Sequence, residues 1–410
     1  MIHRTSRFLT CLLVMCSSAF GLDISESCKS GDFWNQPATA SLQGASYSQP
    51  DAEHVRTSSL ALGGLTTGEV IITVNNNKPV SLQAMLYNKG DDGVIDAEAF
   101  NTILNEAKAS IETYTGVKAK LRSGKRDTAV KLKSWEWKWE NGIIRLEANS
   151  SGKKKNFQGE FIRLNMAPNA KVLGGGGASD SITKSELRSS ITTEEDGTVW
   201  LKGVPMVDQG QKGYCMPATL ARIFAFYGMD KVDQHTLADL CDSGAGGGTT
   251  SRGMEMAMEN VCKKFRTKFI ILEDFVTTYK SILEPYNKLA KREDKPTMTI
   301  NSNLFETADA KLLRQARAGK NSQISKWMKD IKKHIDSGSP VIWLVTVGIY
   351  PEEIPLPQSR GGHARLIIGY NLKEKTIIYT DSWGADHARK TIPAADAIGM
   401  TMGRYVIKLR

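Results

Sequence analysis

The chain has 410 residues and a formal net charge of +10, from 54 basic and 44 acidic residues. This length exceeds one ordinary domain and suggests two or three. The hydrophobic content of 40% excludes the collagen-like and disordered classes. We attribute the positive charge to solubility, with attraction to an anionic cell wall or membrane surface as the alternative. No basic stripe with interleaved aromatic residues is present, so we do not expect a nucleic-acid partner.

Residues 1–21 have the pattern of a secretory signal peptide. Arg4 and Arg7 precede a largely apolar run from Phe8 to Phe20, and Ala19–Gly21 has the small-x-small form of a cleavage site. The run is too short to span a membrane comfortably, and no later segment qualifies, so we expect no integral membrane span. The mature chain is predicted to be secreted or periplasmic.

The first half of the mature chain divides by composition. Residues 22–57 are polar and are predicted to form a flexible lead-in. Residues 58–166 are predicted to form a small α+β accessory domain or pro-domain. Its strands Glu69–Val74 and Pro79–Tyr87 flank an asparagine-rich turn, and a helix follows over Ala97–Thr115.

A row of tryptophans marks a hairpin in the same unit. Trp135, Trp137 and Trp139 alternate with charged residues, and the chain returns after Asn141-Gly142 in a second alternating run. We expect these rings to form the buried face of a sheet. A platform for carbohydrate stacking is the alternative.

Residues 167–199 are predicted to be a linker rich in Gly, Ser and Thr. It contains the four consecutive glycines Gly174–Gly177, and the stretch that follows has no periodicity. The second domain is then predicted to cover residues 200–410.

Cys215 is predicted to stand at the N-terminus of a helix. A glycine-punctuated segment precedes it, Pro217 suits a first helical turn, and Leu220, Ile223 and Phe224 share a face after it. The partial positive charge at a helix N-terminus lowers the pKa of a thiol and favours the reactive thiolate. An isolated cysteine is more often buried and inert, so the residues around it decide the interpretation.

Two further polar residues flank a predicted hairpin near the C-terminus. His363 begins an alternating strand, and Asp381 follows the return strand. Each lies nine residues from residue 372, so a turn centred there would place them opposite each other. Directly opposed residues have Cβ atoms about 4.5–5.5 Å apart, which suits a carboxylate–imidazole hydrogen bond.

These pieces resemble the papain-like cysteine peptidases. The segment Gln209-Gly210-x-x-Gly213-x-Cys215 is similar to that family's signature around its nucleophile. His363 with its flanking glycines resembles the histidine strand, and Asp381-Ser382-Trp383-Gly384 resembles the family's Asn-Ser-Trp-Gly segment. The order and the spacing from Cys215 to His363 also fit. The resemblance implies an α+β fold for residues 200–410, with a helical part and an antiparallel sheet.

The resemblance also implies roles. Cys215 would be the nucleophile and His363 its base and the later proton donor to the leaving amine. Asp381 would orient the imidazole. The side-chain amide of Gln209 and the backbone N–H of Cys215 would form the oxyanion hole.

Substrate-binding residues are carried over in the same way. Trp383 would shield the His363–Asp381 hydrogen bond beside the substrate site. A triplet is similar to the glycines that bind substrate backbone in the family, although a flexible loop is an equal alternative; it consists of Gly246, Gly247 and Gly248.

Two departures from the papain pattern are visible. An aspartate, Asp381, replaces the usual asparagine, and Met216 stands where tryptophan is frequent. These features resemble the bacterial branch that trims double-glycine leader peptides. In that branch the peptidase is normally a cytoplasmic part of a membrane exporter, which disagrees with the predicted signal peptide.

The predicted function is therefore a secreted cysteine endopeptidase that acts on a protein or peptide through a thioester. A transglutaminase-like acyl transferase or deamidase, and an inactive binding protein on the same fold, are the alternatives. The N-terminal unit is interpreted as a pro-domain or as a targeting or substrate-binding module. We expect neither a cofactor nor a metal, because the remaining histidines and cysteines lack ligand spacing. A disulfide between Cys241 and Cys262 is left open.

Overall fold

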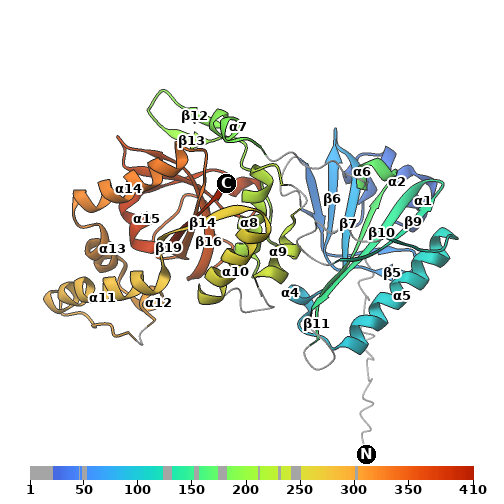
Figure 1. Cartoon of the computed structure of the whole chain (residues 1–410), viewed down its shortest axis with the longest axis horizontal. Coiled ribbons are helices and arrows are strands. Elements are labelled where there is room, and N and C mark those ends of the chain that lie inside the picture. Colours follow the sequence, from blue (N-terminus) through green and yellow to red (C-terminus); the bar gives the residue numbers. More distant parts are fainter. Residues whose placement is uncertain are drawn as a thin grey trace, which may run out of the picture.

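The computed structural model describes residues 22–45, 47–48, 53–122, 132–151, 157–173, 182–210, 213–229, 232–241, 251–300 and 303–410. The predicted signal peptide lies outside these residues. The chain forms an N-terminal part (residues 22–173) and a C-terminal part (residues 182–410), which lie side by side along the long axis of the molecule (Figure 1). No helix in the described ranges has both the length and the apolar character needed to cross a bilayer.

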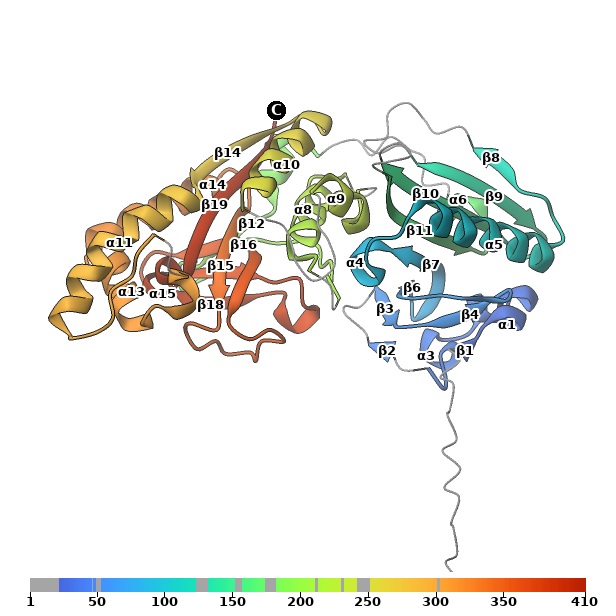
Figure 2. The same ribbon diagram turned by 90° about the horizontal axis from the view of Figure 1, so that it is seen from below.

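The N-terminal part is built on an antiparallel sheet. Its strands, in spatial order, are β2 (Tyr47–Ser48), β3 (His54–Thr57), β6 (Val70–Asn75), β7 (Lys78–Asn88), β11 (Gln158–Ala167), β10 (Gly142–Ser151), β9 (Lys133–Trp139) and β8 (Lys120–Arg122). Helix α5 (Ala97–Thr115) lies along one face of this sheet (Figure 2). It buries Phe100, Leu104, Ala107 and Ile111 in a core that the sheet shares.

Several predicted elements are confirmed here. Strands β6 and β7 are joined by a turn in which Asn76 and Asn77 have positive φ, a conformation that asparagine tolerates well. Helix α5 begins after Asp96, whose carboxylate accepts a hydrogen bond from the backbone N–H of Ala99. The tryptophan row lies on β9 and its rings pack in the core, with Trp137 fully buried.

The predicted flexible lead-in is ordered. Residues 22–57 contain β1 (Leu22–Asp23), α1 (Ser25–Ser30), α2 (Asp32–Asn35), α3 (Ala38–Ser41), β2 and β3. Strand β1 pairs with β4 (Leu60–Leu62), which also pairs with β5 (Leu65–Thr66). The prediction was wrong because the segment's average polarity hides a few widely spaced apolar side chains, among them Ile24, Phe33 and Trp34, which are buried in the same core.

The C-terminal part has its own antiparallel sheet. The order is β12 (Ile191–Thr193), β13 (Val199–Leu201), β16 (Gly361–Asn371), β15 (Val341–Val347), β19 (Thr401–Leu409) and β14 (Thr267–Glu273), while β17 (Thr376–Thr380) pairs with β16 and with β18 (Lys390–Pro393). The helices of this part include α8 (Cys215–Phe226), α9 (Gln234–Leu240), α10 (Ser251–Lys264), α11 (Phe275–Arg292), α12 (Leu304–Thr307), α13 (Ala310–Ala318), α14 (Asn321–Ile335) and α15 (Ala394–Met400). The mixture of helix and antiparallel sheet agrees with the predicted α+β class.

The predicted linker over residues 167–199 is partly structured. The four-glycine run lies outside the described residues, but α7 (Lys184–Ser189) and β12 follow it. Thr183 and Glu186 form a capping box at the start of α7. Through β12 and β13 this segment extends the C-terminal sheet beside β16. These elements were missed because they are short, and their edge positions leave them without strong periodicity.

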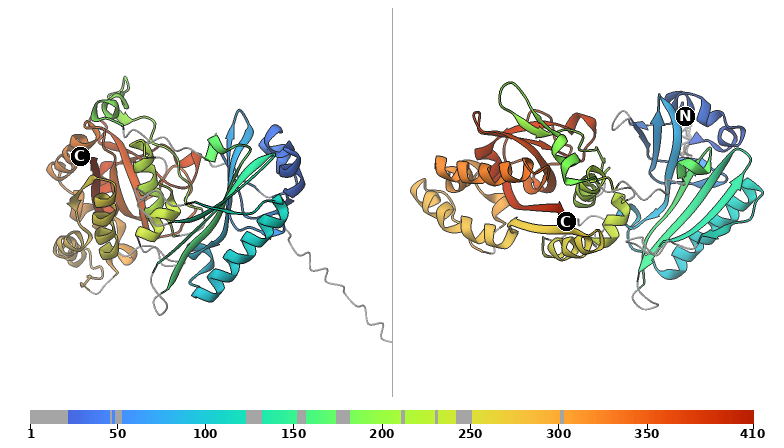
Figure 3. Two further views of the ribbon diagram at one scale, coloured as in Figure 1. Left: turned by 45° about the vertical axis from the view of Figure 1, so that its right-hand side comes forward. Right: turned by 45° about the horizontal axis from the view of Figure 1, so that its top comes forward.

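Helix α8 occupies the centre of the molecule. It packs against β16 and α9, and in both views of Figure 3 these yellow-green helices lie between the orange-red sheet and the N-terminal part. Leu220, Ile223 and Phe224 are fully buried in the C-terminal core. The packing of α8 therefore fixes its N-terminus, at Cys215, between the two parts of the molecule.

The central strand β15 provides a test of this core. Ile342 is fully buried, so its truncation to alanine should lower the free energy of unfolding by about 2–5 kcal/mol, from lost burial and the cavity left behind. Ile271 on β14 is 47% exposed and is the matched control, expected to change stability by about 0.5 kcal/mol or less. Urea unfolding of both alanine variants measures the difference. Equal losses would show that β15 is not a core strand.

Candidate active site

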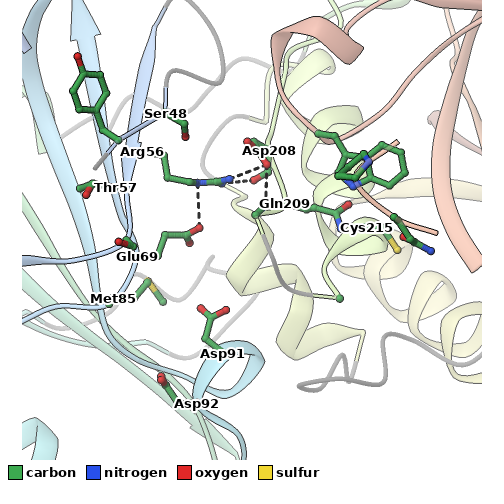
Figure 4. A pocket seen from close by; sticks show the side chains of 18 of the residues that line it. Ser48, Arg56, Thr57, Glu69, Met85, Asp91, Asp92, Asp208, Gln209 and Cys215 are labelled. Carbon is green, nitrogen blue, oxygen red and sulfur yellow. Dashed lines mark hydrogen bonds and ion pairs between the residues drawn. The ribbon is translucent and has the colours of Figure 1, made fainter. Parts of the chain in front are cut away.

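A large open cavity separates the two parts of the molecule and contains Cys215. Its volume is about 1220 Å³, and its lining includes Gln209, Trp383 and the N-terminal residues Arg56 and Glu69 (Figure 4). Pockets for small ligands are typically about 300–1000 Å³, so this one has room for a larger, extended ligand. The candidate site is thus a cleft with walls from both parts.

Cys215 is the first residue of α8, as predicted. Tyr214 precedes it and accepts the first helical bond, from the N–H of Ala218, through its backbone carbonyl. The sulfur lies where the unpaired N–H groups of the first turn give a partial positive charge. Cys215 is partly exposed, which leaves the thiol open to the cleft.

His363 and Asp381 meet in the interior next to this thiol. Nε2 of His363 lies 3.0 Å from Oδ1 of Asp381, and both side chains are fully buried. An ionised carboxylate only accepts hydrogen bonds, so Nε2 carries the proton and donates it. Nδ1 has no nitrogen or oxygen partner among the described residues, and the imidazole interacts with the Cys215 side chain. In space, the imidazole therefore lies between the thiol and the carboxylate.

The hairpin register that predicted this contact was wrong by two residues. Leu366 pairs with Thr380, and a bulge interrupts the ladder between Ile367 and Gly369. Asp381 therefore lies just beyond the end of β17 instead of directly across from His363. The side chains meet because the loop after β17 folds back, where the N–H of Asp381 donates to the carbonyl of His387.

Trp383 covers the imidazole. Its ring stacks on that of His363 with centroids 3.9 Å apart and an interplanar angle of 11°. A stacked indole keeps water away from one face of the His363–Asp381 pair. Trp383 also lines the cleft, so the structure places it both beside the imidazole and at the surface that a ligand would contact.

Asp381 is held by two buried cations that the sequence analysis did not identify. Nε of Arg365 lies 2.8 Å from Oδ1 of Asp381, and Nζ of Lys390 lies 2.5 Å from Oδ2. Glu352 pairs with both cations, at 2.9 Å from Arg365 and 3.2 Å from Lys390. Two carboxylates and two cations balance, so the group is neutral only if Asp381 stays ionised.

The pKa directions follow from this arrangement. Burial raises the pKa of the Cys215 thiol, but the hydrogen bond and charge of His363 outweigh it and the net shift is downward. Burial lowers the pKa of His363, but Asp381 and Cys215 reverse this and raise it. Burial raises the pKa of Asp381, but Arg365 first, and then His363 and Lys390, bring it well below its usual range. All three shifts favour a thiolate–imidazolium pair.

Gln209 is tied to the loop that carries Asp381. Its backbone N–H donates to the carbonyl of Ser382 at 2.9 Å, and its side-chain Oε1 accepts from the Ser382 hydroxyl at 2.7 Å. These bonds orient the amide, whose other end carries the N–H groups that an oxyanion hole requires. Arg222 of α8 adds a further tie, donating to the backbone carbonyl of Asp381 at 2.7 Å.

The other sequence-predicted residues have different outcomes. Gly246, Gly247 and Gly248 lie outside the described residues. Cys241 and Cys262 are buried in the C-terminal core and are not joined by a disulfide. Over the described ranges, no three His, Cys, Asp or Glu side chains group in a way that could hold a metal ion.

Some of the missed residues had a signal in the sequence. Arg365 lies two positions after His363 on one strand, and alternate residues of a strand share a face. Arg222 lies about two helical turns after Cys215, on the same face of α8. Glu352 and Lys390 had none, because they come from separate segments that only the fold brings together.

The buried charge balance predicts a cost for neutralising Asp381. Asp381→Asn should lower the free energy of unfolding at pH 7 by about 3–5 kcal/mol, because Arg365 and Lys390 then share a single buried anion. In the wild type this stabilisation is present above the unfolded-state pKa of about 3.9 and is lost as the pH falls toward the folded-state pKa.

Asp330→Asn is the control for that measurement. Asp330 is 49% exposed and lies 3.8 Å from Arg404, which also pairs with Glu273 at 2.9 Å, so its neutralisation leaves Arg404 paired and should cost about 1 kcal/mol or less. Urea unfolding at pH 7 compares the two variants. If Asp381→Asn is as stable as Asp330→Asn, the ionised aspartate does not organise the network.

The comparisons with known proteins agree with the geometry. Residues 201–400 match the family model described as Peptidase_C39 like family, which lies within the papain-like cysteine peptidases. The resemblance predicted from the sequence is thereby confirmed for this part of the chain. No curated protein matches the chain.

Proposed function

We propose that the protein is a cysteine endopeptidase, because residues 201–400 match the Peptidase_C39-like family model, which supports a cysteine peptidase-type domain. One observation carries this proposal: a buried imidazole that donates from Nε2 to Asp381 while its other side interacts with the thiol of Cys215. That order of groups suits nucleophilic attack by sulfur followed by proton transfer.

In the first half of the proposed reaction, the Cys215 thiolate attacks the carbonyl carbon of the scissile peptide bond. The charge that develops on the carbonyl oxygen is stabilised by the side-chain amide of Gln209 and the backbone N–H of Cys215. The His363 imidazolium gives its proton to the leaving amine, the C–N bond breaks, and a thioester to Cys215 remains.

In the second half, a water molecule replaces the amine in the cleft. Neutral His363 removes a proton from this water, whose oxygen attacks the thioester carbonyl. The C–S bond breaks, the sulfur leaves as a thiolate, and the carboxylic acid product departs. Asp381 stays ionised throughout and stabilises the imidazolium each time it forms.

The proposed substrate is a protein or peptide, which the family match and the open cleft both support. We propose an extracytoplasmic site of action from the signal-peptide pattern of residues 1–21. The proposed reaction requires no cofactor, since the thiolate and the water molecule supply the attacking electron pairs and the imidazole carries the protons. The family match favours hydrolysis of peptide bonds over acyl transfer or deamidation.

The proposal predicts peptide cleavage that depends on one of the thiols. Wild-type protein incubated with a diverse peptide pool should cut internal peptide bonds, and Cys215→Ala should abolish cutting. Cys262→Ala is the control, because that thiol is buried in the core and burial raises its pKa. Mass spectrometry maps the cuts. Transfer to added amines without hydrolysis would favour the acyl transferase, and no reaction of a folded protein would favour a binding protein.

The pKa directions predict how Cys215 responds to pH. Alkylation of Cys215 by iodoacetamide should persist well below the usual cysteine pKa of about 8.5, because His363 lowers the thiol pKa. His363→Ala should move this reaction to higher pH. Proteolysis should in turn decline as the pH rises through the raised pKa of His363, since a neutral imidazole cannot protonate the leaving amine. Wild-type labelling that starts only near the usual cysteine pKa would contradict the pairing.

A further inference from the structure

Both ends of the segment that carries Gln209 and leads to Cys215 are held by the N-terminal part. At the first end, Arg56 of β3 lies between Glu69 and Asp208 (Figure 4). Its Nη1 is 2.8 Å from the Asp208 carboxylate, its Nη2 donates to the Asp208 carbonyl at 2.6 Å, and its Nε is 3.2 Å from Glu69. This two-point contact fixes both the side chain and the backbone of the residue before Gln209.

Asp208 passes this constraint to the turn that follows. Its carboxylate accepts a hydrogen bond from the N–H of Gly210 at 2.8 Å. Gly210 has φ of 72°, and a Cβ added there would lie 3.0 Å from Glu69 and 3.4 Å from Arg56. The positive φ favours glycine at this position, and a Cβ there would crowd the side-chain ends of Glu69 and Arg56. The turn that presents Gln209 thus packs against the side chains of Arg56 and Glu69.

At the second end, Tyr214 is inserted into the N-terminal part. Its hydroxyl donates to Oδ1 of Asn88 at 2.8 Å, and its ring is 2% exposed. A Cβ on Gly90, in the short helix α4 (Lys89–Asp92), would lie 2.5 Å from the Tyr214 ring. The residue directly before the nucleophile is thus packed and hydrogen-bonded outside its own sheet.

The N-terminal part contacts the segment around Gln209 and Tyr214 but does not fill the cleft, as an inhibitory pro-domain would. Cys215 remains partly exposed in a cavity to which the N-terminal strands contribute the opposite wall. The contacts hold the chain on either side of the reactive groups and leave the thiol open. Arg163 of β11 adds an ion pair with Asp233, the residue before α9, at 2.6 Å.

Building on the proposed function, we infer that the N-terminal part is a lasting component of the active enzyme, in which Arg56 and Asn88 are positioning residues for Gln209 and Cys215. Displacements of about 1 Å in an active site can cost about 10²-fold in rate, so loosening either anchor should slow the reaction. A pro-domain that is removed on activation has no such requirement.

Tyr214→Phe in the full chain tests the second anchor. It deletes only the hydroxyl that reaches Asn88, and Tyr214 does not line the cleft. We expect kcat to fall about tenfold with KM unchanged, because the nucleophile is less well placed. The pH midpoint of Cys215 alkylation by iodoacetamide should rise. Tyr87→Phe is the matched control, since its hydroxyl bonds to Gly93 and Gly159 inside the N-terminal part.

Arg56→Met tests the first anchor independently. We expect kcat to fall about tenfold, with partial recovery in Arg56→Lys, which keeps a charge that can reach Asp208. Arg145→Met is the control. Arg145 has a similar exposure and likewise combines ion pairing with a backbone hydrogen bond, but its partners, Glu136 and Leu173, lie within its own part.

The outcomes separate this inference from the proposed function. Wild type that cleaves no peptide and shows no alkylation at lowered pH contradicts the proposed function itself. Active wild type with Tyr214→Phe and Arg56→Met equal to their controls overturns only the inference. Mass analysis of the active protein is an independent measurement: full activity in protein that has lost residues 22–173 would overturn the inference, and activity confined to protein that retains them supports it.

Discussion

The carboxylate of Asp381 is the constraint on which the candidate site depends. It lies in the protein interior, where an unpaired charge is very unfavourable, and it is shared by the imidazole of His363 and the cations Arg365 and Lys390. An asparagine could orient His363 but could not neutralise two buried cations. The aspartate found in this sequence is therefore explained by its neighbours, and Glu352 completes the balance of charge.

The fold assembles this network where strands of one sheet end. Strand β16 presents His363 and Arg365 on one face, β17 ends one residue before Asp381, and β18 starts with Lys390. Because β16 pairs with β15 and β17, the imidazole rests on a rigid support. Groups that are fixed before a substrate arrives need little reorganisation during a reaction, which is the main source of electrostatic stabilisation in enzymes.

The two parts of the molecule meet at the loop before α8. In the proposed mechanism this loop supplies an oxyanion donor and leads to the nucleophile, yet Gly210 and Gly213 give it little stiffness of its own. The loop is held in place by hydrogen bonds from other segments: Ser382 binds it on one side, and Arg56 of the N-terminal part binds it on the other. A site made in this way depends on contacts between segments that are remote in the sequence.

Local patterns in the sequence determined the elements and the motif. Helical periodicity predicted α5, and alternation predicted the β9–β10 hairpin and β16. The resemblance to the papain-like peptidases predicted that Gln209, Cys215, His363 and the Asp381 segment come together. Only the tertiary structure decided the β16–β17 register, the network of Glu352 and Lys390, and the anchors at Arg56 and Asn88. The reason is physical: propensity and periodicity act between residues close along the chain, whereas a bulge, a buried charge balance and a contact between sheets depend on packing of distant segments.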